Sequence, residues 1–527
     1  MRRFLIVATA ILFCAGHAFG KPSSVPLNLE QLAQRKFSTP PLTEAEKRVL
    51  QHASEGTVAD CRDLGGGDDP AKADGSPKTP DEKWPASRNV RADLIRWLFV
   101  DREAREQVDP RGVRIQGARI TGALDVSFTN LPFPLLLQSC RLEQDLNVEY
   151  AKMPALSLEG SWTGAIAADE LNSEGSILLR KGFHAKGMVR MLGATIGGNL
   201  DADGGIFEKS KDDDDALAAD RIKVTGNVIL AYGFVAVGPV RLPGAEVKGQ
   251  LDVEDAWLDE LDLDSAHITG PFTWKNIHKD HHPDFPKQEW KPSLDLADAK
   301  VGPLNDQEAS WPEKGWLRLD GFVYDRIAAG PTDAKARLRW LGLQPDQLGY
   351  LPQPYEQLIA VSRQMGNEDQ VAEVAIAKQW DLRKHGHLGW LGWIQNWFLY
   401  LVVGYGYRPW LAFVWMAILV ALGTLVFSRA RLPSVGAMVP SGKDAYEPDE
   451  KTEKATLPHY YQQFHPFVYS LDVILPFDLG QKSQWRLHER RPRDFGYWLF
   501  VSYSLFQLFI GWVLLLVAAA VPAGLIK

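Results

Sequence analysis

The chain has 527 residues, enough for two or three domains, and a formal net charge of −8 with both signs plentiful. That balance argues against a nucleic-acid-binding protein, which should present a basic face. Glycine (45 residues) and tryptophan (18 residues) are abundant. Half of the tryptophans lie at or after Trp380 among apolar stretches, and tryptophan favours membrane interfaces.

Residues 1–20 are predicted to be a signal peptide. Arg2 and Arg3 form a basic segment, residues 4–15 are apolar, and AFG at 18–20 places small residues before a cleavage site. The alternative is an uncleaved N-terminal anchor. No lipidation is expected at Cys14. Cleavage would place the following chain outside the cytoplasm.

Residues 21–111 are predicted to form a cap of short helices and loops. Thr43 is a good N-cap followed by acidic residues, and residues 92–100 form a short amphipathic helix. Residues 64–82 have the composition of a flexible loop. The two cysteines that follow the signal peptide are Cys61 and Cys140. In an oxidising compartment they either form a disulfide or stay as thiols.

Residues 112–325 contain an internal repeat. GARITGALDV at 117–126 returns as GATIGGNLDA at 193–202 and GAEVKGQLDV at 244–253, and SAHITGPF at 265–272 follows the same frame. Weaker copies start at Ser139, Gly182 and Gly233. Regular internal periodicity of this kind indicates a repeat architecture.

Within a repeat the apolar residues alternate, as in a strand with one buried face. Such short strands bury their apolar side only by stacking turn upon turn, at about 22 residues per turn. The prediction is a mainly β protein with a right-handed parallel β-solenoid; a β-sandwich is the alternative. Glycines at 122, 198 and 249 would let the backbone bend. The predicted inward residues are Ile120, Leu124, Ile196, Leu200, Val247 and Leu251. The predicted outward residues are Arg119, Asp201 and Asp252.

The region that follows, residues 326–387, changes to helical periodicity. Residues 354–384 read as two helices separated by a turn at Gly366 and Asn367. We expect this helical hairpin to cap the solenoid, because an open end would expose unpaired strand edges.

Residues 388–527 are predicted to be a membrane region. Uncharged stretches at about 409–428 and 495–520 are long enough to span a bilayer. Residues 388–407 suggest an interfacial helix, with a third span as the alternative. Loop 429–494 is then cytoplasmic, in agreement with the positive-inside rule. Its basic residues near the spans are Arg429, Arg431, Lys482, Arg486, Arg490, Arg491 and Arg493.

Several segments resemble bacterial membrane proteins related to pentapeptide-repeat proteins. They are the repeat units, GWLRLDGFVY at 315–324, QPYEQL at 353–358, GYGYRPW at 404–410 and YSLDVILP at 469–476. The likeness covers most of residues 85–520, although the units depart from a strict five-residue repeat. Members are often labelled membrane-associated oxidoreductases, so the resemblance implies a redox activity at the membrane.

The C-terminal part also resembles two-helix cation channels, in which a pore loop lies between the spans. Residues 466–480 occupy that position but lack a Thr-Val-Gly-Tyr-Gly filter, and the expected topology places them on the cytoplasmic side.

Two polar clusters within residues 112–325 are candidate metal sites. His278, His281, His282 and Asp280, with Asp284 nearby, offer imidazole and carboxylate ligands for zinc or another divalent ion. Asp212 to Asp215 offers carboxylates for calcium, although the spacing matches no known calcium loop. The alternative for both is a polar loop projecting from the solenoid.

No catalytic residue or cofactor is predicted. The sequence contains no G-x-G-x-x-G between strand and helix, no C-x-x-C and no G-x-S-x-G. The most specific cluster outside the repeats is a set of partner-binding or pore-lining candidates in the loop between the spans. The alternative role is helix capping or subunit packing, and the residues are Tyr469, Asp472, Pro476 and Asp478.

The sequence favours a non-enzymatic scaffold of the bacterial inner membrane, with its large N-terminal domain in the periplasm. Its expected partners are the lipid bilayer and a protein or envelope component, with homo-oligomers possible and no nucleic acid. An oligomeric ion-channel-like pore or sensor, and a membrane-associated oxidoreductase, are the alternatives.

Overall fold

The computed structural model describes residues 27–64, 84–430, 438–441, 447–448, 455–456, 461–487 and 495–520. The signal peptide and nearly all of the 64–82 loop lie outside these residues. The chain divides into two compact units, one of residues 1–332 with 339–345, the other of residues 333–338 with 346–527.

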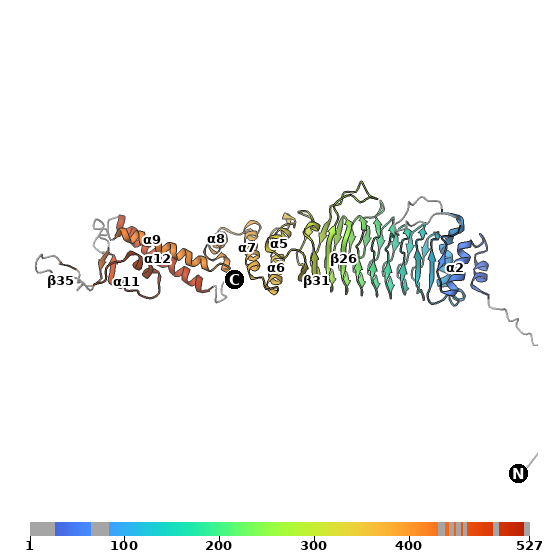
Figure 1. Ribbon diagram of the computed structural model, residues 1–527, viewed down its shortest axis with the longest axis horizontal. Coiled ribbons are helices and arrows are strands. Elements are labelled where there is room, and N and C mark those ends of the chain that lie inside the picture. Colours follow the sequence, from blue (N-terminus) through green and yellow to red (C-terminus); the bar gives the residue numbers. More distant parts are fainter. Residues whose placement is uncertain are drawn as a thin grey trace, which may run out of the picture. The chain divides into compact units, whose positions relative to one another are not determined.

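The first unit is a parallel β-solenoid of about nine turns, which confirms the predicted fold class (Figure 1). It runs from β3 (Val113–Gln116) to β33 (Val323–Ala329). A typical turn holds four short strands: β9 (Lys152–Met153), β10 (Leu156–Ser157), β11 (Trp162–Thr163) and β12 (Ile166–Ala167). Each strand pairs in parallel with its counterpart one turn away.

A column of apolar side chains runs through the solenoid core. Leu135, Leu156 and Ile177 are register partners on successive turns, and the column continues through Leu200, Val228, Leu251 and Phe272. All of them are almost completely buried, as are the other residues predicted to point inward. The alternation in the sequence therefore gives the correct inward face.

Two of the residues predicted to point outward are nevertheless mostly buried. Asp201 and Asp252 are only 5% and 8% exposed, whereas Arg119 is partly exposed and pairs with Glu143. Asp201 is in register with Leu178 and Ile229 of the neighbouring turns, and its carboxylate accepts a hydrogen bond from Arg180 of the preceding turn at 2.8 Å. Alternation within one strand does not reveal this burial, because the neighbours that cover the two aspartates lie on adjacent turns.

The glycines between short strands form a ladder. The N–H of Gly198, Gly226, Gly249 and Gly270 each donates to the carbonyl of the glycine one turn before, Gly175 in the case of Gly198. A Cβ at Gly249 would lie 2.4 Å from the carbonyl oxygen of Gly226. Gly198 and Gly249 are therefore required for the close approach of stacked backbones, and of the three glycines expected to bend the chain only Gly122 has a positive φ.

One corner of the solenoid has the same left-handed backbone conformation on every turn. The residues at this corner have φ between 52° and 75°, although most of them are not glycine. Except on the last turn, the backbone N–H of each of these residues donates to a backbone carbonyl of the next turn. The column consists of Phe128, Tyr150, Glu170, Gly193, Arg221, Gly244, Ser265, Asp298 and Gly321.

Helices cover the N-terminal end of the solenoid (Figure 1). Thr43 caps α2 (Glu44–Glu55) through a capping box with Glu46, as predicted. Glu46 is fully buried and accepts hydrogen bonds from Arg91, with an Nε–Oε1 distance of 2.7 Å. Cys61 and Cys140 are both buried as thiols, and burial raises the pKa of Cys61 to about 11.

At the other end of the first unit, residues 339–345 lie over the last turns. Trp340, from α5 (Ala334–Leu341), packs its ring against Trp311, Phe322 and Tyr324. An aromatic cluster therefore covers the apolar end of the core.

The second unit is helical. Its principal helices are α6 (Pro352–Gln364), α7 (Glu368–His385), α8 (Trp390–Val403), α9 (Trp410–Ala430), α10 (Pro466–Ile474) and α12 (Phe495–Ala520). Among the described residues, α9 and α12 are the two helices long and apolar enough to cross a membrane. With 14 residues, α8 is about 21 Å long, short of a bilayer core of about 30 Å. That length favours the interfacial reading over a third span.

Candidate functional site

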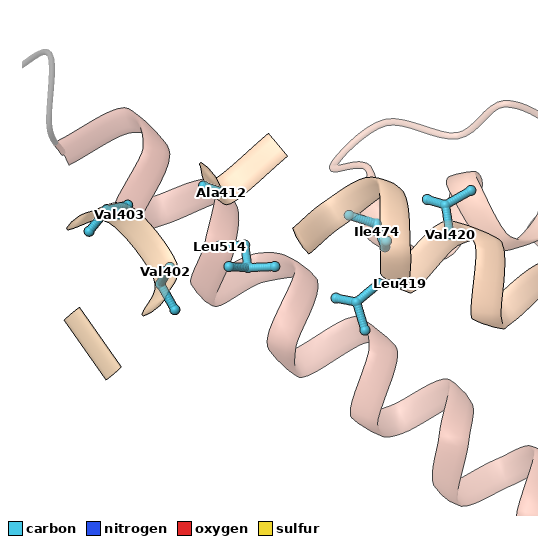
Figure 2. Close-up of a cluster of buried hydrophobic side chains, with 7 residues drawn as sticks. All are labelled: Val402, Val403, Ala412, Leu419, Val420, Ile474 and Leu514. Atoms are coloured by element: carbon cyan, nitrogen blue, oxygen red, sulfur yellow. The ribbon is translucent and has the colours of Figure 1, made fainter. Parts of the chain in front are cut away.

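The site predicted between the two long helices is built on α10. Pro466 begins this helix, where its missing N–H costs no hydrogen bond, and the chain leaves the helix at Leu475, just before Pro476. Helix α10 packs against both α9 and α12. Figure 2 shows Ile474 of α10 among apolar side chains of α9 and α12, including Leu419, Val420 and Leu514.

A buried hydrogen-bond network fixes α10 between the long helices. The Ser470 hydroxyl donates to the carbonyl of Val420 on α9 at 3.0 Å. The Gln507 amide on α12 donates to the carbonyl and the hydroxyl of Ser470 at 2.9 and 2.7 Å. Gly423 gives the space for this contact, because a Cβ there would lie 2.1 Å from the Ser470 hydroxyl. One serine therefore connects all three helices.

Asp472 closes the loop that follows α10. Its carboxylate is fully buried and accepts backbone N–H bonds from Leu479, Gln481 and Lys482 at 2.8, 2.9 and 2.8 Å. The ammonium group of Lys482 lies 3.8 Å from Asp472 and donates to its backbone carbonyl. Asp472 is thus an anchor for residues 479–482, with no face toward solvent.

The other three predicted residues separate into a buried group and an exposed group. Tyr469 is buried in an aromatic cluster with Phe427, Phe464 and Trp485. Pro476 and Asp478 lie on the exposed tip of the loop. The N–H of Gly480 donates to Asp478 at 2.7 Å and lowers the pKa of that carboxyl group. A partner or permeating ion can therefore reach Pro476 and Asp478 but not Tyr469 or Asp472.

The histidine-rich segment makes separate local contacts. His278 stacks on Trp257, with ring centroids 3.7 Å apart, and its two nitrogens face Asp255 and Asp280 at 2.7 and 3.3 Å. His282 meets the same tryptophan edge-on, and burial lowers its pKa. His281 faces the backbone carbonyl of Gln288.

The carboxylates of the acidic run at 212–215 also contact different partners. Asp213 accepts a hydrogen bond from Ser210, and Asp215 lies 3.5 Å from Arg241. Within the described part of the chain, no three His, Cys, Asp or Glu side chains are grouped as a metal site. Metal binding at either segment stays a prediction from the sequence alone.

Sequence reasoning missed Ser470, Gln507 and Gly423. The one feature of the sequence that could have indicated this network is Gln507, an amide in the middle of an otherwise apolar stretch. Polar residues inside such stretches usually have a hydrogen-bond partner. Nothing near residue 507 in the sequence identifies Ser470 as that partner.

No protein-family model, curated protein or solved structure matches the chain. The resemblance to pentapeptide-repeat-related membrane proteins therefore stays an expectation, and so does the redox activity that it implies.

Proposed function

We propose that the chain is a non-enzymatic scaffold of the bacterial inner membrane, anchored by α9 and α12 and presenting the β-solenoid in the periplasm. The observation that carries the anchoring is the exposure of apolar surface. In the most apolar 18-residue segments of α9 and α12, only 28% and 22% of the residues are buried. A core helix of a soluble protein would bury most of its apolar surface, so the exposed apolar surface of these two helices supports the proposed bilayer anchoring.

The scaffold role is supported by the flank of the solenoid. Phe128 is 75% exposed and stacks on Tyr150 of the next turn, with ring centroids 4.8 Å apart and an interplanar angle of 11°. Both residues lie at the left-handed corner, where a large exposed ring contributes nothing to the core. Exposed aromatic rings on a rigid surface are typical contact residues for a partner.

The topology gives the first test. A phosphatase reporter, active only outside the cytoplasm, should be active when fused after Gly270 and silent when fused after Gly442, because the proposal places one span between them. The full-length chain should also stay in the membrane fraction after carbonate washing. The opposite reporter pattern, or release by carbonate, would overturn the proposal.

An oligomeric pore is the second candidate, favoured by one observation. Helix α10 enters between α9 and α12 and is held there by a buried serine and a buried glutamine, as a re-entrant helix would be. The exposed tip that follows carries Phe477 and Leu479 beside Asp478.

Reconstitution separates the candidates. For a scaffold we expect cation flux equal to that of empty vesicles and a purified protein without absorption in the visible range. Flux that depends on an oligomeric species in mass measurements would favour the pore instead. A bound chromophore that changes colour on reduction would favour the oxidoreductase.

A further inference from the structure

Arg383 lies in an aromatic cage between α7 and α8. Its guanidinium carbon is 3.7 Å from the ring centroid of Trp380, 4.3 Å from that of Trp397 and 5.4 Å from that of Tyr400. The faces of these rings favour a cation. Since Arg383 already fills the cage, the cage is not suited to a cationic ligand.

The charge of Arg383 has no anionic partner among the described residues. All three of its guanidinium nitrogens are buried and make no hydrogen bond within the described part of the chain. The nearby carboxylate of Asp381 is engaged by His385 at 2.8 Å. Buried donors without an acceptor are costly, so this group indicates a missing acceptor.

A cavity of about 630 Å³ lies beside the cage and is lined by Arg383. That volume is in the range of small-ligand sites. Lys384 adds a second cation, and the other lining residues are Tyr355, Ala377, Trp380, Asp381, Trp393 and Trp397.

The helix that forms one wall of the cavity also exposes an apolar face. Trp390 is 73% exposed, and Leu391, Trp393, Ile394 and Leu401 of α8 are also largely exposed. Helix α8 ends just before α9, which the proposed function places in the bilayer. Exposed tryptophans beside cationic groups are typical of the level of the lipid headgroups.

We propose that Arg383 and Lys384 bind the phosphate of an anionic phospholipid whose acyl chains lie along the exposed face of α8. A planar guanidinium offers paired N–H donors to phosphate oxygens. The inference rests on the proposed membrane anchoring and adds a specific lipid site to it. The class of ligand follows from the combination of unpaired donors, a cavity and an adjoining apolar face.

The test measures lipid binding to the full-length protein after delipidation in detergent, by native mass spectrometry. Wild-type protein should bind phosphatidylglycerol more tightly than phosphatidylcholine. Arg383→Gln should weaken phosphatidylglycerol binding by about tenfold, the effect of losing a hydrogen bond to a charged group. The matched control is Arg363→Gln, which removes one charge from an exposed position on α6 and should keep the preference.

The outcomes are distinguishable. Equal binding of the two lipids by wild type, or an unchanged preference in Arg383→Gln, would overturn the site. If Arg383→Gln does not fold, Lys384→Gln at an exposed position should reduce the preference in its place, and an unchanged preference there would also overturn the site. Displacement of the lipid by millimolar inorganic phosphate would reassign the site to free phosphate.

Carbonate washing tests the anchoring itself. The Arg383→Gln variant should stay in the membrane fraction, whereas release of the wild-type protein would contradict the proposed function.

Discussion

Replacing Leu200 by aspartate should unfold the centre of the β-solenoid. Leu200 is 1% exposed and lies in the core column between Ile177 and Val228. A carboxylate there has no described cation inside the core, and an unpaired buried charge costs about 3–5 kcal/mol. Because each turn is stabilised by its two neighbours, the damage should extend to both sides of the substitution.

Chemical unfolding of the full-length chain and limited proteolysis between residues 177 and 228 would measure this effect. Arg119→Ala is the control, since its pair with Glu143 is partly exposed and should contribute less than about 1 kcal/mol. Burial raises the pKa of a carboxyl group, so the folded state favours the protonated form and the loss should shrink as pH falls. An unchanged unfolding midpoint in Leu200→Asp would show that the register is wrong.

Removal of the Asp472 carboxylate should free the loop after α10. Asp472→Ala would leave the N–H groups of Leu479, Gln481 and Lys482 without their acceptor, that of Gln481 in a buried place and the other two in partly buried places. A buried unsatisfied donor costs about 1–3 kcal/mol, so the N–H of Gln481 alone should account for a loss of at least about 1 kcal/mol. The effect should concentrate in the loop, because the Ser470 network that holds α10 does not include Asp472.

Hydrogen exchange at these three amides and trypsin cleavage after Lys482 give the readouts. Both should increase in Asp472→Ala and stay near wild type in Asp478→Ala, whose carboxylate is exposed and accepts a single backbone N–H bond. If exchange is unchanged in Asp472→Ala while recovery of a partner or ion flux falls, the residue has a binding or pore role in place of a structural one.

The repeat was predictable because its information is local. Ile120, Leu124 and Leu200 alternate with polar residues inside a few positions, and most turns follow one another at intervals of 21 to 23 residues. The same local pattern did not reveal the burial of Asp201, because its register partners Leu178 and Ile229 and its ion-pair partner Arg180 lie on adjacent turns.

The candidate sites were less predictable because they join distant segments. The contact of Ser470 with Gln507 spans 37 residues and depends on how three helices pack. The cage around Arg383 needs α7 and α8 to meet, although each contributes only ordinary interfacial aromatics to the sequence. Asp472 was recognised as important, but its inward direction depends on a loop that returns to it.

The repeated left-handed corner gives every turn of the solenoid the same backbone geometry, so the height of the solenoid rises by a constant amount per turn. The same backbone geometry at Phe128, Arg221 and Asp298 closes each turn, whatever side chain is present. A whole turn added or removed would change the height by about 4.8 Å, and the present solenoid of about nine turns is roughly 40 Å tall. The number of repeats therefore sets, in discrete steps, the distance between the two ends of the solenoid.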